Sequence, residues 1–156
     1  MKAKFKNRFN IIIENNNVKR AGVIPYRFND KGEVEVYCMI PSDPAYGGTS
    51  PQLAKGKIDR GESAISTAWR EGEEELGLKK SNIKDGKLEL LGYFNYTGMD
   101  VGTDIMAVFY GEVIDENDWG QPHYETGWSG WVNLSTEFEK LRRNQQIYYK
   151  LLLTKV

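Results

Sequence analysis

The stretch GKIDRGESAISTAWREGEEELGL, residues 56–78, decides the fold of this chain. Its second half predicts a helix, because apolar residues recur at helical spacing and Gly77 follows as a natural helix end. Within that helix the run REGEEELG, residues 70–77, contains four glutamates. Like charges at such spacings repel each other by roughly a few tenths of a kcal/mol per pair. The charge therefore either lies on a solvated face or is neutralised by a positive partner.

The glutamates do not form one group on a helical wheel. The apolar positions of the expected helix form one stripe: Ile65, Ala68, Trp69, Gly72 and Leu76. At about 100° per residue, Glu71, Glu74 and Glu75 fall on one flank of this stripe and Glu73 falls on the other. Mg²⁺ prefers carboxylate oxygens, so the converging glutamates indicate a cation site. The alternative is a solvated acidic face on which Arg70 pairs with Glu74 at i+4.

The loop before the helix favours the first alternative. The chain resembles the Nudix box, G-x5-E-x7-R-E-U-x-E-E-x-G-U, in which U is a bulky aliphatic residue. The matching positions are Gly56, Glu62, Arg70, Glu71, Glu74, Glu75, Gly77 and Leu78. One position departs from the pattern, because Gly72 stands where an aliphatic residue is expected. We expect Trp69, one turn earlier, to fill the space that Gly72 leaves.

The resemblance implies an α/β fold: a Nudix-type α/β/α sandwich with a mixed β-sheet and a catalytic loop–helix–loop, in a single domain over residues 1–156. It implies an enzyme that hydrolyses a pyrophosphate bond in a nucleoside diphosphate linked to another group, with Mg²⁺ or Mn²⁺ as cofactor. Residues matching the family's metal ligands are Glu71, Glu74 and Glu75, with a backbone carbonyl at Lys55 or Gly56. Glu71 also matches a catalytic position that orients the water.

Two further residues of the motif have supporting roles in the family. Arg70 matches a catalytic-site arginine that holds the glutamates and the loop in place. Glu62 matches a more distant supporting acid. Lys57, in the loop, is a candidate phosphate contact, and ordinary surface charge is the alternative for it.

A second acidic candidate lies downstream, in HYETGWSGWVNL at residues 123–134. This segment resembles the loop that supplies a further acid in RNA 5′-pyrophosphohydrolases and dinucleotide-hydrolysing members. Glu125 is accordingly a candidate metal ligand or general base, with a surface glutamate as the alternative. His123 is the only histidine and is interpreted as a plain loop residue. Tyr124 and Trp128 are candidates for stacking on a base, which tolerates different bases.

The substrate marker outside the motif is Tyr96, residue 18 counted from Leu78. Adenosine polyphosphate hydrolases often carry a tyrosine at that position, so dinucleoside polyphosphates are the favoured substrates. ADP-ribose hydrolases often carry a proline slightly earlier, where this chain has Tyr93 and Phe94. Packing within a strand is the alternative role for Tyr96. ADP-ribose or FAD-type dinucleotides and RNA 5′ ends are the other enzymatic readings, and a non-catalytic sensor is disfavoured because every acid of the motif is present.

The remaining sequence predicts alternating strands and helices, typical of a mixed α/β domain. Strands are expected over 19–28, 33–40, 87–96, 103–114 and 127–134. Residues 53–62 are expected to form a short strand end followed by a loop, and residues 97–102 a hairpin connection. A terminal helix is expected over 135–153, capped by Ser135 or Thr136. Pro25 favours an edge position or a bulge for the first strand. The loop at 41–51 is long enough to be functional.

Composition limits the possible partners. The net charge is −1, so duplex DNA and anionic membranes are poor default partners and a basic RNA path is not evident. The basic N-terminal residues lack the apolar run of a signal peptide, and residues 10–13 are too few to span a bilayer. Cys38 is the only cysteine and lies in an apolar strand pattern, which predicts a small core residue and a cytoplasmic, reducing location.

Overall fold

The computed structural model describes residues 18–96 and 104–156, so the predictions on residues 1–17 and on the connection at 97–102 lie outside the described residues. A mixed sheet of six strands forms the centre. Its strands are β1 (Val18–Phe28), β2 (Val34–Pro41), β3 (Ala54–Lys57), β4 (Glu89–Asn95), β5 (Ile105–Glu112) and β6 (Thr126–Asn133). The order is β4-β5-β1-β2-β6, with β3 paired to β1. Only the β1–β5 pairing is parallel among the pairings of the described strands.

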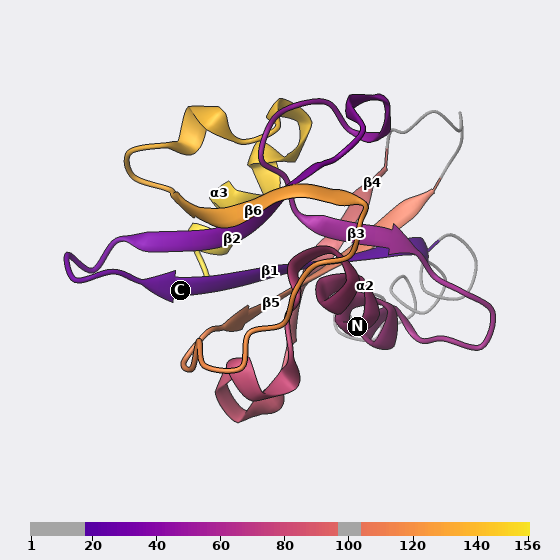
Figure 1. The fold of residues 1–156 in the computed structure, drawn as a ribbon, viewed down its shortest axis with the longest axis horizontal. Coiled ribbons are helices and arrows are strands. Elements are labelled where there is room, and N and C mark those ends of the chain that lie inside the picture. The colour runs from indigo at the N-terminus through magenta and orange to yellow at the C-terminus, as the bar shows by residue number, and fades with distance from the viewer. Residues whose placement is uncertain (1–17, 97–103) are drawn as a thin grey trace, which may run out of the picture.

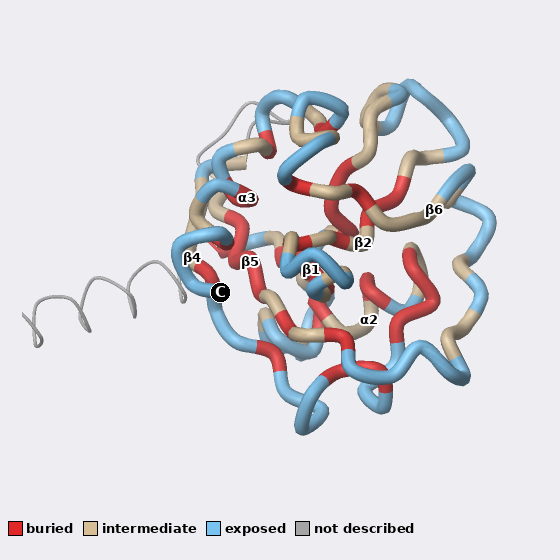
Figure 2. Tube along the Cα trace, turned by 90° about the vertical axis from the view of Figure 1, so that its left-hand side faces the viewer, coloured by how far each residue is buried: buried red, intermediate tan, exposed pale blue. Residues whose placement is uncertain are grey.

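Two helices cover opposite faces of the sheet (Figure 1). Helix α2 (Ala64–Leu76) contributes Ala68 and Leu76 to one buried cluster. Helix α3 (Gln146–Leu153) contributes Tyr148, Tyr149 and Leu152 to the other. The buried segments in Figure 2 accordingly lie between these helices and the strands. This arrangement confirms the predicted α/β/α sandwich with a mixed sheet.

The first strand is central, so the edge position that Pro25 favoured was wrong. The alternative, a bulge, is not found at Pro25, because the β1–β5 register shifts between Val18 and Arg20. β1 pairs with β3 over Arg20–Val23 and with β2 over Tyr26–Phe28, and it pairs with β5 along its other side. Tyr26 O accepts from Val113 N at 2.7 Å on the β5 side. Because successive residues of a strand direct their backbone groups to alternate sides, Pro25 N faces the side where β1 changes partner from β3 to β2. A missing N–H is tolerated there.

The C-terminal helix is shorter than predicted. The predicted range was 135–153, whereas α3 comprises only Gln146–Leu153. Two 3₁₀ turns precede it: η4 (Phe138–Lys140) and η5 (Arg143–Gln145). The Asn133 side chain accepts from Ser135 N at 2.7 Å and from Thr136 N at 3.2 Å. This Asx-type turn takes the backbone donors that a helix start at Ser135 would need.

The buried face of α2 extends further toward the glutamate flank than the apolar stripe predicted. Its buried residues are Thr67, Ala68, Glu71, Gly72 and Leu76. Ile65, which belongs to the apolar stripe, is 39% exposed. A cap at Ser63 fixes the helix start, since its side chain accepts from Ser66 N. The helix ends at Gly77, which has the left-handed backbone that favours glycine.

Gly72 is accommodated by neighbours other than Trp69. A Cβ at Gly72 would lie 3.1 Å from both Leu78 Cδ2 and Val23 Cγ1. These two side chains, and not Trp69, occupy the space that an aliphatic residue would fill, so that expectation was wrong. A larger residue at this position would therefore require Leu78 or Val23 to shift by a few tenths of an ångström.

Cys38 agrees with the prediction of a small core residue. Cys38 is fully buried, and burial raises the pKa of its thiol to about 12, as fits a core residue. Among the residues that the structure describes, no helix is long and apolar enough to cross a membrane.

Candidate active site

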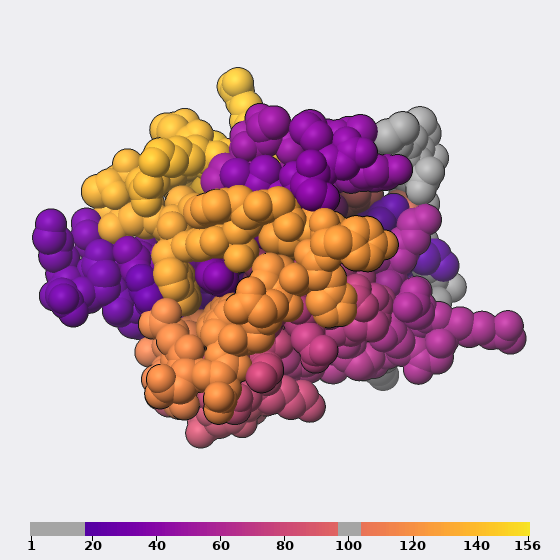
Figure 3. All heavy atoms as spheres, viewed as in Figure 1, coloured from indigo at the N-terminus to yellow at the C-terminus, as the bar shows by residue number. Residues whose placement is uncertain are grey.

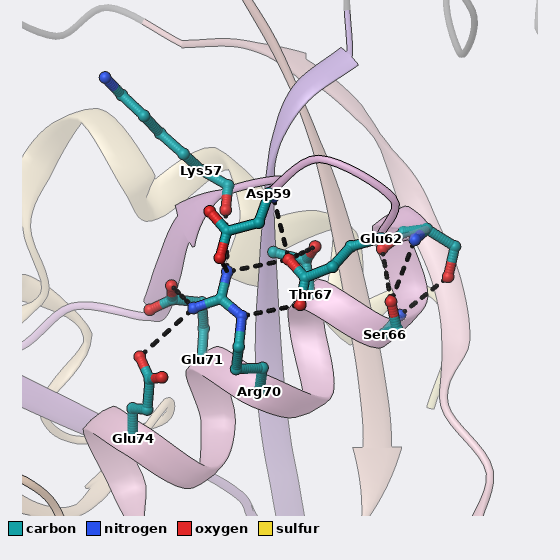
Figure 4. A network of polar contacts seen from close by, with 9 residues as sticks. Lys57, Asp59, Glu62, Ser66, Thr67, Arg70, Glu71 and Glu74 are labelled. Carbon is teal, nitrogen blue, oxygen red and sulfur yellow. Dashed lines mark hydrogen bonds and ion pairs between the residues drawn. The ribbon is translucent and has the colours of Figure 1, made fainter.

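Arg70 supplies the positive charge that the glutamate helix requires (Figure 4). Its guanidinium donates to the Glu62 carboxylate twice, from Nε to Oε2 at 2.8 Å and from Nη2 to Oε1 at 3.0 Å. Its Nη1 donates to Glu71 Oε1 at 2.8 Å and to Glu74 Oε2 at 3.4 Å. The pairing of Arg70 with Glu74 suggested by the sequence is therefore the longest of several contacts.

Glu62 fixes the loop before α2 to Arg70. Its Oε1 also accepts from Asp59 N at 3.0 Å and from Thr67 Oγ1 at 2.9 Å. The hydrogen bonds from Arg70 are the largest of the causes that lower the pKa of Glu62 to about 2. Asp59 Oδ2 lies 3.3 Å from Arg70 Nη2. Glu62 thus stays ionised at neutral pH and orients the guanidinium toward the helix.

Glu71 and Glu75 are held in positions where a negative charge is unfavourable. Burial raises the pKa of Glu71 to about 7 and that of Glu75 to about 8. The charge of Glu125 raises both values further, and the contacts with Arg70 and with Lys55 oppose the rise. Lys55 N donates to Glu75 Oε1 at 2.9 Å. A cation at this place would stabilise both carboxylates.

Gly56 lies against the Glu71 carboxylate. A Cβ at position 56 would overlap Glu71 Oε1, closer than the non-bonded contacts of real Cβ atoms. Gly56 pairs with Ala21 in the β1–β3 ladder, so the backbone there cannot move away easily. Only glycine lets the carboxylate and the strand approach each other this closely.

Glu125 reaches the same place from the connection between β5 and β6. Its neighbour His123 donates from its backbone N to Glu74 O at 2.7 Å, which attaches this connection to the end of α2. Figure 3 shows the connection, in orange, lying against the magenta surface of α2. The structure therefore brings Glu125 to the glutamates of the motif, although it is distant from them in sequence.

A pocket of about 460 Å³ opens beside the carboxylates of Glu75 and Glu125. Its lining includes Glu75 and Glu125, Lys55 from β3, and two tyrosines from different loops, Tyr46 and Tyr124. The side chain of Tyr124 is 87% exposed and that of Tyr46 is 78% exposed. The volume lies within the range of about 300–1,000 Å³ that is usual for small-molecule sites.

Tyr96 lies next to this pocket without lining it. The ring is half-buried, with the guanidinium carbon of Arg20 at 4.1 Å and Lys55 Nζ at 5.1 Å from its centroid. Lys55 lines both the main pocket and a smaller hollow that contains Tyr96. The predicted substrate contact of Tyr96 stays a prediction, and Lys55 is the residue that links it to the site.

Two other predicted substrate residues lie outside the pocket lining. The Lys57 carbonyl accepts from Arg70 Nη2 at 3.0 Å, while its ammonium extends away from the network (Figure 4). Trp128 is 42% exposed and packs over Gly130, where a Cβ would lie 2.5 Å from Trp128 Cζ2. Their substrate roles also stay predictions.

The residues present fit a divalent cation by their chemistry. Within residues 18–96 and 104–156, no three His, Cys, Asp or Glu side chains are already close enough to hold a metal ion. The available donors are nevertheless hard oxygens, which suit Mg²⁺ or Mn²⁺: the carboxylates of Glu71, Glu74 and Glu75 and the carbonyl of Gly56. Glu71 and Glu74 share Arg70 Nη1, so both carboxylates lie on one side of the helix.

Sequence reasoning missed two residues that support the site, Thr67 and Gln52, and it missed the backbone donor of Lys55. Thr67 is fully buried and bonds Glu62, although the wheel placed it outside the apolar stripe. Lys55 contributes its backbone N–H to Glu75, which no side-chain pattern reveals. Gln52 is 2% exposed and donates to Gly47 O at 2.9 Å, which ties the loop carrying Tyr46 to the sheet. Gln52 lies two residues before β3 and forms an isolated bridge with Met39, which its sequence context did not indicate.

Comparison with known proteins identifies the class. The fold and the family match are those of a pyrophosphohydrolase, an enzyme class whose members generally use divalent metals. A model of the NUDIX domain matches residues 18–153, so the chain belongs to the NUDIX domain family. A comparison with curated proteins gave no match.

Solved structures of the same fold include enzymes and a ligand-bound domain. The binary complex of the Ap4A hydrolase of C. elegans is 22% identical, with a TM-score of 0.65 over 88% of this chain and 96% of that chain. The NUDIX domain of Shewanella oneidensis NrtR, complexed with ADP ribose, is 13% identical, with a TM-score of 0.71 over 99% of this chain and 98% of that chain. RenU, a Nudix hydrolase of M. smegmatis, is 14% identical, with a TM-score of 0.65 over 89% and 86%. At these identities the likeness concerns the fold.

Proposed function

We propose that this chain hydrolyses a pyrophosphate bond in dinucleoside polyphosphates with Mg²⁺ or Mn²⁺ as cofactor. The observation that carries the proposal is the position of Lys55. Its side chain lines the pocket that contains the exposed tyrosines, and its Nζ lies 5.1 Å from the centroid of the Tyr96 ring, outside that pocket. A dinucleoside polyphosphate has two bases that can stack on aromatic rings and a polyphosphate that a cation attracts. Tyr124 shares the pocket with Lys55, and the Tyr96 ring is next to Lys55 Nζ.

The proposed roles of the glutamates and of Arg70 follow from their positions. Glu71, Glu74, Glu75 and the Gly56 carbonyl are the proposed metal ligands. A bound divalent cation neutralises the pyrophosphate oxygens and lowers the pKa of the attacking water. Arg70 keeps the carboxylates oriented through its contacts with Glu71 and Glu74.

Glu125 is the proposed general base or additional ligand. It lines the pocket together with Glu75, so its carboxylate is placed to accept a proton from water next to the bound pyrophosphate. Glu75 belongs to α2 and Glu125 to the connection before β6, so the two carboxylates can contact a substrate from different sides. The Lys55 side chain supplies positive charge to the same pocket.

The second candidate substrate is ADP-ribose or a related dinucleotide such as FAD. The domain of NrtR, which has the same fold, was crystallised with ADP ribose. Such a substrate also places one nucleoside and a pyrophosphate in the pocket. ADP-ribose has only one base to stack on an aromatic ring, so Tyr96 would contribute less to its binding.

A substrate panel tests both candidates. We expect hydrolysis of dinucleoside polyphosphates with Mg²⁺ or Mn²⁺ to exceed that of ADP-ribose, dinucleotide cofactors, nucleoside triphosphates and triphosphorylated RNA. Preferential hydrolysis of ADP-ribose would favour the second candidate. Binding of nucleotides without any turnover would contradict the proposed enzyme and indicate a nucleotide sensor.

A further inference from the structure

One segment, residues 119–126, forms hydrogen bonds to the carbonyls at the C-terminal end of α2. The final carbonyls of a helix have no intrahelical partners, and here Gly77 N bonds back to Glu73 O, so that the next carbonyls need donors from elsewhere. The segment supplies four hydrogen-bond donors, each to a different carbonyl. Two are backbone amides: His123 N donates to Glu74 O at 2.7 Å and Gly120 N donates to Gly77 O at 2.8 Å. Two are side chains: Thr126 Oγ1 donates to Glu75 O at 2.8 Å and Trp119 Nε1 donates to Leu76 O at 2.7 Å.

Two glycines allow the segment to approach α2 this closely. A Cβ at Gly77 would lie 2.1 Å from Gly120 O, and a Cβ at Gly120 would lie 2.8 Å from Gly77 O. The backbones are therefore in direct contact. The donors also lie at the end of the helix where the macrodipole is negative, which strengthens hydrogen bonds from N–H and O–H groups.

Glu125 lies between two of these attachments. His123 and Thr126 are bonded to α2 on either side of it, and the Glu125 carbonyl accepts from Ser42 N at 2.9 Å. Its backbone is consequently fixed both to α2 and to the loop that follows β2. A glutamate in a long connection would otherwise lose its position through loop motion.

Glu75 connects the segment 119–126 to the candidate active site. Its carboxylate accepts from Lys55 N at 2.9 Å, and its carbonyl accepts from Thr126 Oγ1 at 2.8 Å. One residue thus links β3, α2 and the start of β6. A shift of Thr126 would move Glu125 relative to Glu75 while leaving both side chains intact.

We infer that Thr126 and Trp119 are positioning residues, which set the placement of Glu125 against the glutamates of α2 through the carbonyls of Glu75 and Leu76. The inference rests on the proposed function in so far as Glu125 takes part in hydrolysis. The hydroxyl of Thr126 is the more specific of the two groups, because a valine has nearly the same shape and lacks only the donor.

The experiment compares three threonine variants. Thr126→Val removes the donor and Thr126→Ser retains it. Thr154→Val is the matched control, because Thr154 Oγ1 donates to Leu151 O at 2.7 Å at the end of α3. We expect Thr126→Val to lower kcat at least tenfold with KM within about twofold of wild type, and we expect Thr126→Ser and Thr154→Val to keep kcat.

Two readouts do not depend on turnover. Thr126→Val should weaken Mn²⁺ binding in isothermal titration calorimetry, because a displaced Glu125 stabilises the cation less. It should also speed hydrogen exchange of the amides in residues 120–126 and leave the exchange of β1 and β5 unchanged. A loss of global stability would instead speed exchange in the central strands as well.

The outcomes separate this inference from the proposed function. Wild-type kcat, Mn²⁺ affinity and exchange in Thr126→Val would overturn the positioning role. So would an equal loss in Thr154→Val, or a loss that Thr126→Ser does not restore. A wild-type protein that is inert on all substrates would overturn the proposed function, and unchanged Mn²⁺ binding and exchange in Thr126→Val would then still overturn the inference.

Discussion

Arg70 and Glu62 form a two-point contact, with Nε–Oε2 at 2.8 Å and Nη2–Oε1 at 3.0 Å. This contact uses one edge of the guanidinium and leaves Nη1 to bind Glu71 and Glu74. The orientation of the glutamates on α2 is therefore set by a residue of the preceding loop. The spacing between Glu62 and Arg70 in the motif has a direct geometrical reason.

Arg70→Lys should lower kcat/KM at least tenfold, equivalent to about 1.4 kcal/mol of transition-state stabilisation. A lysine keeps the charge but lacks the planar fork that reaches Glu62 and Glu71 together. Steady-state kinetics on the preferred substrate measure the loss. Arg27→Lys is the matched control, since Arg27 also contacts two carboxylates, those of Glu35 and Glu116, and is not in the pocket lining. Equal losses in the two variants would contradict the role of the fork.

Gly56→Ala should abolish most activity with a small effect on folding. The added Cβ would overlap Glu71 Oε1, so the carboxylate must leave its present position. Activity and the midpoint of thermal unfolding are the two measurements. Gly32→Ala is the control: Gly32 has a φ of 77°, and a Cβ there has open space around it, so only the backbone strain of about 1–2 kcal/mol is introduced. Retained activity in Gly56→Ala would show that Glu71 is not needed where the structure places it.

The local structure of residues 56–78 was predictable because the residues that contact each other there are close in sequence. Residues 56–78 form one strand end, one loop and one helix, and the contacts among Glu62, Arg70 and Glu71 lie within it. The strands were also predictable from their apolar patterns. The long-range contacts were not, because nothing in the residues around Trp119 indicates that their donors meet the last carbonyls of α2. The central position of β1 was missed for a similar reason, since the change of partner at Pro25 depends on two other strands.

Glu74→Gln should abolish hydrolysis and leave the fold intact, whereas Glu73→Gln should be nearly silent. The two residues are adjacent and chemically identical, which makes them a matched pair. Glu74 faces Arg70 at 3.4 Å, and Glu73 is exposed on the other flank of α2. Turnover rates and the far-UV circular dichroism spectrum distinguish loss of chemistry from loss of structure. Near wild-type activity in Glu74→Gln would contradict the metal assignment.

The metal-free protein should lose stability as the pH rises from about 4.5 to about 8. The folded-state pKa values of Glu71 and Glu75, about 7 and about 8, lie above the ordinary value of 4.5. The folded state therefore holds these protons more tightly than the unfolded state, and this contribution to stability is complete below pH 4.5 and lost as the pH passes the raised values. Chemical denaturation at a series of pH values without divalent metal measures the trend.

Mg²⁺ should in consequence stabilise the protein more at pH 8.5 than at pH 6. Binding must displace the protons that Glu71 and Glu75 retain at the lower pH. The increase of the unfolding midpoint at a fixed Mg²⁺ concentration should grow with pH, and calorimetry in buffers of different ionisation enthalpy should detect proton release. An Mg²⁺ effect of the same size at both pH values, without proton release, would place the cation away from these carboxylates.

Tyr124→Ala should raise KM about fivefold or more and leave kcat nearly unchanged. Tyr124 lines the pocket with its side chain 87% exposed, so its ring is available to stack on a base, an interaction of about 1–3 kcal/mol. Tyr124→Phe should retain the wild-type KM, because stacking needs the ring and not the hydroxyl. Phe28→Ala removes another exposed aromatic ring outside the pocket lining and should leave KM unchanged. If Tyr124→Ala instead lowers kcat at constant KM, the ring supports the neighbouring Glu125 and does not bind the base.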